Sequence, residues 1–296
     1  MVSVIDTFCF NGEWVVPMRL EYLNDWVDAF VIVESHWTHS GLRKPQLFKD
    51  IYADWFVPYA HKIHWVIVND FPEVTAEWLE TYRAQSWMRD NQVHWFREAY
   101  QRDVAGDYIR RHLLGGGNAG SAGDCIVHVS DADEIPNVSL FHSEFKPAIL
   151  AYTVPVYLEQ VFFYYNFHWR KTYKWHRAYV IPGAQLTAKG TSLTQWRVCP
   201  STDSFIVSNA GWHFSYFMTP EELQKKLAAF AHRECDQERW NSLEHIHRCI
   251  SQGLDLFERD NEAMTYYDPE ADPTFPRVFL SYRDALIESQ VGSKSI

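Results

Sequence analysis

The sequence has few cysteines, and they follow no regular spacing. Its five cysteines lie at positions 9, 125, 199, 235 and 249 of 296 residues, without a CxxC pair or a Cys/His pattern. Disulfide frameworks and structural zinc sites need paired or closely spaced ligands. The cysteines therefore argue against both.

Long apolar stretches are also missing. The sequence has no run of about 18 apolar residues, and Met1 is not followed by the basic and apolar segments of a signal peptide. We therefore expect no membrane-spanning segment in this chain. The expected location is the cytoplasm, or a lumen for a domain separated from its membrane anchor.

Positive charge is scarce. Lysine and arginine together number 27 against 38 aspartates and glutamates, which gives a formal net charge of -11. Proteins that bind DNA or RNA neutralise phosphates with a basic surface. The charge balance therefore argues against a nucleic-acid partner.

Apolar and aromatic residues are plentiful. Hydrophobic residues make up 47% of the chain and aromatic ones 16%, including 13 Trp and 16 Tyr. This supply suits one large core, so we expect residues 1–296 to form a single domain. Exposed aromatic faces also suit sugar rings, because they combine a flat apolar surface with a polar edge.

Apolar runs with polar ends recur along the first half of the chain. Residues 2–10, 29–33, 63–68 and 125–129 read as buried strands, and helical patterns occupy the segments between several of them. This rhythm predicts an α/β fold with a mainly parallel central sheet flanked by helices. Ligand sites in such sheets lie beyond the carboxyl ends of the strands.

Three acidic side chains follow the last of these runs. Asp131, Asp133 and Glu134 stand at the expected carboxyl end of the strand 125–129. Three neighbouring carboxylates repel one another unless a cation binds, and Mg²⁺ or Mn²⁺ prefers such oxygen ligands. An Asx-rich turn that closes the strand explains the same residues without any metal.

A single histidine lies in the strand-like segment 209–215. His213 is surrounded by aromatic residues, and a lone histidine of this kind is more often a core residue than a ligand. Thr219-Pro220-Glu221-Glu222 follows as a capping box and predicts a helix start just beyond it. The position also suits a metal ligand next to a site, so both interpretations remain open.

The run 161–175 combines aromatic rings with cations. Arg170, Lys171 and Lys174 are interspersed among Phe, Tyr and Trp residues. Complete burial would leave these charges without solvent. We therefore expect about half of the rings in the core and the rest in a surface wall with the cations.

Taken together, these motifs resemble glycosyltransferase family 17. The resemblance covers nearly the whole chain and rests on Phe10-Asn11-Gly12-Glu13 with Arg19, residues 27–35 with Thr38 and Gly41, Asp70-Phe71-Pro72, residues 130–136, and residues 210–215 with Thr219-Pro220-Glu221. It implies a GT-A fold, UDP-GlcNAc as the sugar donor, an acceptor glycan, Mn²⁺ (or Mg²⁺) as the metal, and inversion at the anomeric carbon. The aromatic run resembles that of bacterial and viral-type members. Residues 1–136 would bind the nucleotide sugar and residues 137–296 the acceptor.

The resemblance also assigns roles by position. Asp131 and Asp133 match the DxD pair, with Asp133 as the direct metal ligand, Asp131 nearer the ribose, and His213 completing the metal shell. The expected nucleotide-binding residues are Phe8, Asn11, Glu13, Arg19, Glu34, Ser35 and Asp131. The expected acceptor-binding residues are Trp169, Arg170 and Trp212.

The catalytic base has no local signature. An inverting transfer needs a base on the acceptor hydroxyl. Glu159 is our first choice and Glu134 our second, with Glu234 and Asp236 as further carboxylates. Two other classes stay open: a glycoside hydrolase with paired carboxylates and no metal, and a non-catalytic carbohydrate-binding protein.

Overall fold

The computed structural model places seven strands in one main sheet. It describes residues 3–81, 92–114, 124–141, 145–189, 192–198, 204–229, 237–259 and 263–292. The strand order is β10 (Phe205–Val207), β6 (Val156–Leu158), β9 (Tyr179–Pro182), β4 (Cys125–Val129), β1 (Ser3–Cys9), β2 (Ala29–Ser35) and β3 (Ile63–Val68). Neighbouring strands among β4, β1, β2 and β3 pair in parallel, whereas β9 runs antiparallel to both β4 and β6. The predicted mainly parallel sheet is confirmed.

A second sheet of five strands continues the structure. Its order is β12 (Met264–Tyr266), β8 (Asn166–Lys171), β7 (Val161–Tyr164), β11 (Gly211–Ser215) and β5 (Glu134–Pro136). The short strand β5 follows directly from the turn after β4, so this turn joins the two sheets. Both predicted halves of the chain contribute strands to both sheets.

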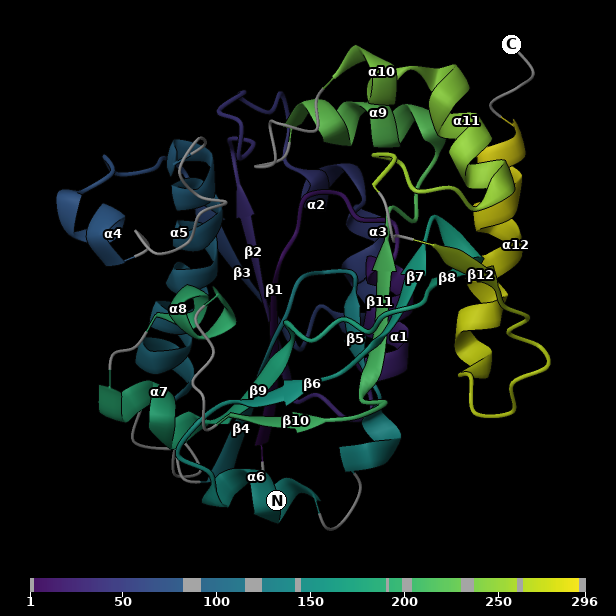
Figure 1. The fold of residues 1–296 in the computed structure, drawn as a ribbon. Helices are drawn as coiled ribbons and strands as arrows, with labels where there is room; N and C mark the ends of the chain where they lie inside the picture. The colour runs from purple at the N-terminus through teal and green to yellow at the C-terminus, as the bar shows by residue number, and fades with distance from the viewer. Residues whose placement is uncertain are drawn as a thin grey trace.

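Helices cover both faces of the main sheet (Figure 1). Figure 1 shows α5 and α8 on one flank and α1 and α12 on the other. The α-helices are α1 (Val16–Leu23), α2 (Phe48–Ile51), α3 (Ala53–Phe56), α4 (Ala76–Thr81), α5 (Gln92–Tyr108), α6 (Phe145–Ala151), α7 (Gly183–Lys189), α8 (Leu193–Val198), α9 (Pro220–Ala229), α10 (Glu238–Asn241), α11 (Leu243–Gln252) and α12 (Arg277–Gly292). Short helical turns are η1 (Val57–Tyr59), η3 (Ile109–Leu113) and η5 (Val138–Phe141).

The apolar run in β2 shows why helices are needed on both sides. Phe30 and Ile32 pack into the core on the α1 side, while Val31 and Val33 pack into the core on the α5 side. Successive side chains of a strand point to opposite faces, so a fully apolar strand must be covered twice. This explains why the apolar residues of β2 form a continuous run and do not alternate with polar ones.

The capping box at the start of α9 forms as predicted. The Glu222 amide donates to Thr219 Oγ1 at 3.2 Å, and the Thr219 amide donates to Glu222 Oε2 at 2.9 Å. The reciprocal pair satisfies two amide groups that the helix itself cannot.

Candidate active site

The acidic turn Ser130–Glu134 lies where the strand order of the main sheet reverses. From β1 the chain continues to β2 on one side, whereas β4 pairs with β1 on the other. Ligands of open α/β sheets bind at such a switch point, beyond the carboxyl ends of the strands. Two hydrogen bonds between Asp131 and Glu134 close the turn. The Glu134 amide donates to the Asp131 carbonyl at 3.1 Å, and the Asp131 amide donates to Glu134 Oε2 at 2.8 Å.

The buried Arg19 side chain holds this turn in place through hydrogen bonds. Its guanidinium donates to both oxygens of Asp6, to Ser130 Oγ at 2.7 Å, and to the carbonyls of Asp131 and Glu134 at 2.9 Å. Burial would raise the pKa of Asp6, but Arg19 and His128 outweigh it and hold that pKa below its usual range. Arg19 has no exposed surface. Its complete burial favours a role in shaping the turn over the direct nucleotide contact expected from the sequence.

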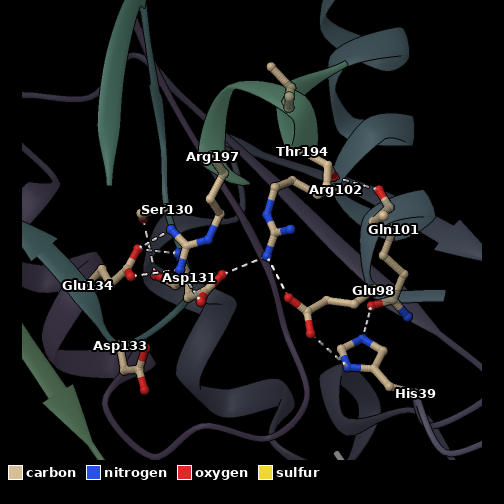
Figure 2. Close-up of polar contacts among 12 residues, drawn as sticks. His39, Glu98, Gln101, Arg102, Ser130, Asp131, Asp133, Glu134, Thr194 and Arg197 are labelled. Atoms are coloured by element: carbon tan, nitrogen blue, oxygen red, sulfur yellow. Dashed lines mark hydrogen bonds and ion pairs between the residues drawn. The ribbon is translucent and has the colours of Figure 1, made fainter. Parts of the chain in front are cut away.

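Two further arginines neutralise the acidic turn (Figure 2). Arg102 on α5 donates to Asp131 Oδ1 at 2.9 Å, and Arg197 on α8 donates to Asp131 Oδ2 at 2.5 Å. Burial would raise the pKa of Asp131, but the two guanidinium groups outweigh it and hold the pKa well below its usual range. We call Arg102, Asp131 and Arg197 the arginine clamp. The clamp relieves the repulsion for which the sequence had suggested a metal.

Glu134 is fully engaged and cannot serve as a base. Arg197 donates to each of its carboxylate oxygens at 2.8 Å, the Asp131 amide donates to Oε2, and Trp175 Nε1 donates to Oε1. The residue has no exposed surface. Charge-assisted bonds of this kind stabilise the ionised form and leave no free lone pair for an acceptor proton. These four hydrogen bonds argue against Glu134 as the catalytic base.

Asp133 and His213 face each other outside the arginine clamp. His213 Nε2 lies 3.6 Å from Asp133 Oδ1, with side-chain exposures of 8% and 13%. Burial would raise the pKa of Asp133, but the charges of His213 and Lys226 outweigh it and lower that pKa. The His213 ring is held between Phe162, stacked at 4.4 Å, and Trp175 at 4.8 Å. These two ring contacts restrict the orientation of the His213 side chain.

This pair fits a divalent cation better than the predicted trio does. Neighbouring ligands of an octahedral ion with bonds of about 2.1 Å are about 3 Å apart, close to the distance found between Asp133 and His213. Among the described residues, the buried His213 Nδ1 has no hydrogen-bond partner, so no second bond there fixes which ring nitrogen carries the proton. Within the described segments, no three His, Cys, Asp or Glu side chains converge on one point. Asp131, the third predicted ligand, is held by the arginine clamp.

The side chains of three expected nucleotide-binding residues make contacts within the fold. Phe8 is buried, and the Arg19 guanidinium carbon lies over the Phe8 ring at 4.4 Å from the ring centre. Glu34 is buried and accepts the amides of Phe48 and Lys49 at 2.6 and 3.0 Å, which caps α2. Ser35 Oγ accepts the amide of Trp37 at 3.0 Å. These side chains shape the edge of the sheet.

Asn11 and Glu13 remain at the edge of the site. The Asn11 amide donates to Glu13 Oε2 at 2.7 Å, which fixes the loop after β1. Burial raises the pKa of Glu13, against the opposing charge of Lys226, and the charge of Asp133 adds to the rise. The nucleotide-binding role of Asn11 and Glu13 stays a prediction.

The three expected acceptor-binding residues have different environments. Trp212 is buried in the core, with its ring 5.9 Å from Tyr22 and 5.3 Å from Phe279, so it offers no face to a glycan. Arg170 lies over the Tyr267 ring at 5.2 Å. Trp169 borders a pocket of about 280 Å³ that is also lined by His168, His247, Ser251 and Tyr266.

Glu159 lies in the segment between β6 and β7. Its amide donates to the Val207 carbonyl at 2.8 Å, and its carbonyl accepts the Ala210 amide at 2.7 Å. These backbone bonds connect it to the end of β10 and to Ala210, the residue before β11 and three residues before His213. The other carboxylates considered as bases, Glu234 and Asp236, lie outside the described residues.

The sequence interpretation missed the two arginines of the clamp. Arg102 and Arg197 come from helices and are separated from Asp131 by 29 and 66 residues. Neither belongs to a motif. Arginine is the residue best suited to carboxylates, but no local pattern links these two to the acidic turn.

Fold and site together define a class of protein: an α/β enzyme with an acidic site at the switch point of a mostly parallel sheet. The chain belongs to glycosyltransferase family 17, whose family model matches residues 2–271. Membership of this family argues against the hydrolase and the non-catalytic binding protein.

Relatives in three mammals share one name, beta-1,4-mannosyl-glycoprotein 4-beta-N-acetylglucosaminyltransferase. Those of Rattus norvegicus and Homo sapiens are 24% and 25% identical to this chain over 318 residues, and that of Mus musculus is 24% identical. Each match covers 95% of this chain and 53 to 54% of the relative, so the chain spans about half the length of these proteins. No solved structure matches significantly. Among the described helices, none combines the length and apolar character needed to cross a membrane.

Proposed function

We propose that this glycosyltransferase transfers GlcNAc from UDP-GlcNAc to an acceptor glycan, with inversion at the anomeric carbon and with Mn²⁺ or Mg²⁺ bound. The names of the mammalian relatives support the donor sugar and a glycan acceptor. The parallel strands and the position of the site support a GT-A fold.

The pair Asp133 and His213 is the observation that carries the metal proposal. The two side chains supply one carboxylate oxygen and one imidazole nitrogen at 3.6 Å, beyond the carboxyl end of β4. Cations of this kind are commonly held by one or two protein ligands together with substrate phosphates. A cation bound there would neutralise the negative charge of the departing diphosphate.

The chain's own residues prepare the remaining steps. Arg19 fixes the turn so that Asp133 keeps its position, which removes the cost of reorganisation when charge develops. Glu13 and Asn11, on the neighbouring loop, would bind the nucleotide. Trp169 and Arg170 would contact the acceptor through stacking and hydrogen bonds.

We assign the catalytic base to Glu159. It would accept the proton of the acceptor hydroxyl while that oxygen forms a bond to the anomeric carbon and the bond to the diphosphate breaks on the opposite face. Its link to the strand that carries His213 supports this assignment, since base and metal must share one site. Glu134 is excluded by its four donors.

A donor panel tests the proposal. Purified protein is incubated with UDP-GlcNAc, UDP-galactose or GDP-mannose, a mannose-containing glycan, and either Mn²⁺ or a chelator. We expect UDP release only from UDP-GlcNAc and only with the cation, and a β-linked product by NMR. Transfer that is equally fast with chelator would overturn the metal proposal, and an α-linked product would overturn inversion.

A further inference from the structure

A pocket of about 280 Å³ lies where strands β8 and β12 meet helices α11 and α12. Figure 1 shows these four elements on the opposite flank of the molecule from α5 and α8. Among the described residues that line the pocket, none belongs to the acidic turn. Ligand pockets in proteins begin at about 300 Å³, so this one has the size for a ligand group of about one ring.

Trp169 forms a rigid wall of this pocket. Its Nε1 donates to the Ile250 carbonyl at 2.8 Å. The Gly253 backbone lies against the indole, because a Cβ on Gly253 would stand only 2.3 Å from Trp169 Cε3. Both contacts fix the orientation of the ring, so little ordering is needed when a ligand packs against it.

Tyr266 and His168 form the rim of the pocket. Their rings are stacked at 5.3 Å with an angle of 2° between the planes, and the Tyr266 ring stands at 83° to Trp169. Tyr266 is 66% exposed, although it belongs to a strand. The rings of Tyr266 and Trp169 therefore make an apolar corner that is open to solvent.

The floor of the pocket is polar. Asn166 and Gln290 are buried, with 8% and 6% exposed. Asn166 Oδ1 accepts the amide of His168 at 3.0 Å, and Asn166 Nδ2 donates to Gln290 Oε1 at 3.4 Å. Gln290 Nε2 in turn donates to the carbonyls of Tyr165 and Met218. These bonds orient both amides, and a side-chain amide such as that of Asn166 carries a second N–H donor.

Apolar walls above oriented amides suit a pyranose ring. Such a ring has C–H groups on its faces, which pack on aromatic rings, and hydroxyls at its edge, which need hydrogen-bond partners. A few fixed polar groups in a largely apolar pocket are the usual way in which proteins orient a small ligand.

The pocket lies on the same side of the second sheet as His213. Trp169 packs against the apolar cluster that contains Phe162, and Phe162 stacks on His213. Only β7 separates β8 from β11, so at about 4.8 Å per strand these two strands are roughly 10 Å apart. A sugar in the pocket is too far from His213 to react, but another part of the same glycan can reach the site.

We propose that this pocket binds one pyranose ring of the acceptor glycan, remote from the hydroxyl that receives the new sugar. The inference rests on the proposed transfer to a glycan. Trp169 and Tyr266 would stack on the sugar ring, and Asn166 would donate to one of its hydroxyls. The pocket then favours extended glycans over single sugars, because two linked sugars bind to two linked sites.

The test combines kinetics and direct binding on the whole protein. The kinetics measure kcat and KM for the mannose-containing glycan and for UDP-GlcNAc. Saturation-transfer NMR measures the Kd of the same glycan without donor. The variants are Tyr266→Leu and Trp169→Leu. Phe205→Leu is the matched control, because Phe205 is also a mostly exposed ring, at 50%, on an edge strand of the other sheet. Circular dichroism checks folding.

We expect a rise in the KM for the glycan of about threefold in Tyr266→Leu and about tenfold in Trp169→Leu, the range that one lost stacking contact produces. The Kd should rise in the same order. Both kcat and the KM for UDP-GlcNAc should stay within about twofold, because the pocket does not touch the reacting atoms. Phe205→Leu should leave every constant within about twofold of the original protein.

A folded Tyr266→Leu protein that keeps the original KM and Kd for the glycan would overturn the inference, even if Trp169→Leu does not fold. A fall in kcat with unchanged KM would also overturn it, since that pattern indicates a structural effect on the site. If the original protein transfers no GlcNAc to the glycan, the proposed function fails, and the NMR titration still decides on the pocket. Binding that Tyr266→Leu weakens would then support the pocket, whereas no binding, or equal binding by both proteins, would overturn it.

Discussion

Arg19 and Asp6 form an ion pair that water does not reach. The Arg19 Nη2 and Asp6 Oδ1 atoms lie 2.6 Å apart, and neither side chain has exposed surface. The pair joins α1 to β1 and, through Ser130 and the carbonyls of the acidic turn, to the end of β4. One side chain therefore links the strands on both sides of the switch point.

Arg19→Met should destabilise the protein by about 3 to 5 kcal/mol, because Asp6 is left as a buried charge without its partner. The acidic turn should also lose its order. Chemical denaturation measures the change in the free energy of unfolding. Arg248→Met, which removes an exposed pair with Glu258 at 3.6 Å, is the control and should cost less than about 0.5 kcal/mol. Equal losses in both variants would contradict the role given to Arg19.

The main sheet could be predicted from the sequence because each central strand is an apolar run of its own. The strands at 63–68 and 125–129 match their predicted ranges. Strand β4 is buried along its whole length, and burial on both faces leaves a continuous apolar pattern. Strand β3 lies at the edge of the sheet and is mostly half-buried, but its sequence is similarly apolar. The acidic turn was found for a similar reason: its residues are consecutive. Which partner each acid has could not be predicted, because Arg102 and Arg197 approach from α5 and α8 through tertiary packing.

The sequence itself argues against the prediction that Trp212 binds the acceptor. Trp212 and His213 are adjacent on β11, and adjacent side chains of a strand point to opposite faces. If His213 faces the site, Trp212 must face away from it. The structure has this arrangement, with Trp212 packed against Phe279 and His213 against Phe162.

The Asp255 carboxylate should make stability depend on acid pH. Burial would raise its pKa, but hydrogen bonds from Arg259 and Lys171 outweigh it and lower the pKa to about 2. A carboxyl group whose pKa is depressed in the folded state stabilises the protein above its unfolded pKa and loses this contribution as pH falls through the folded value. We expect about 2 kcal/mol to be lost between pH 4 and pH 2. Denaturation of Asp255→Asn across this range should show a correspondingly flatter profile, and an unchanged slope would contradict the assignment.

UDP should raise the melting temperature only when Mn²⁺ or Mg²⁺ is present. The reason is that the diphosphate and the Asp133 carboxylate repel each other without a cation between them. At a ligand concentration of about 100 times Kd, binding adds about 2.7 kcal/mol, or a rise of roughly 5 °C for a chain of this size. Differential scanning fluorimetry with and without chelator measures it. Equal stabilisation in both conditions would mean that the cation does not join nucleotide to protein.

Asp133→Asn should abolish transfer and leave the fold intact. The Asp133 side chain is largely buried, with 13% exposed, and the substitution keeps its size and shape while removing the charge, so the packing around it should be preserved. The Phe214 amide bonds to the Asp133 carbonyl at 2.8 Å, a backbone contact that the variant retains. Turnover is measured as UDP release from UDP-GlcNAc, and circular dichroism confirms folding. Near-normal turnover would show that the acidic segment is a turn without a catalytic role.

His213 can be either a metal ligand or a core histidine, and substitutions at this position can distinguish the two roles. Its ring is packed between Phe162 and Trp175 like a core residue, yet its Nε2 faces Asp133 like a ligand. His213→Ala removes both the packing and the nitrogen, so it should lower the melting temperature whichever role is right. His213→Phe keeps most of the ring packing and removes only the nitrogen.

If His213 is a ligand, the two variants should show the same rise in the Mn²⁺ concentration they require but should differ in melting temperature. Both should need about tenfold or more Mn²⁺ for half-maximal rate, because one inner-shell ligand is lost, while His213→Phe should melt closer to the original protein than His213→Ala. If His213 only packs, the Phe variant should keep the original Mn²⁺ requirement. Titrating Mn²⁺ against the folded fraction of each variant therefore decides between them, since packing is held nearly constant in one and lost in the other.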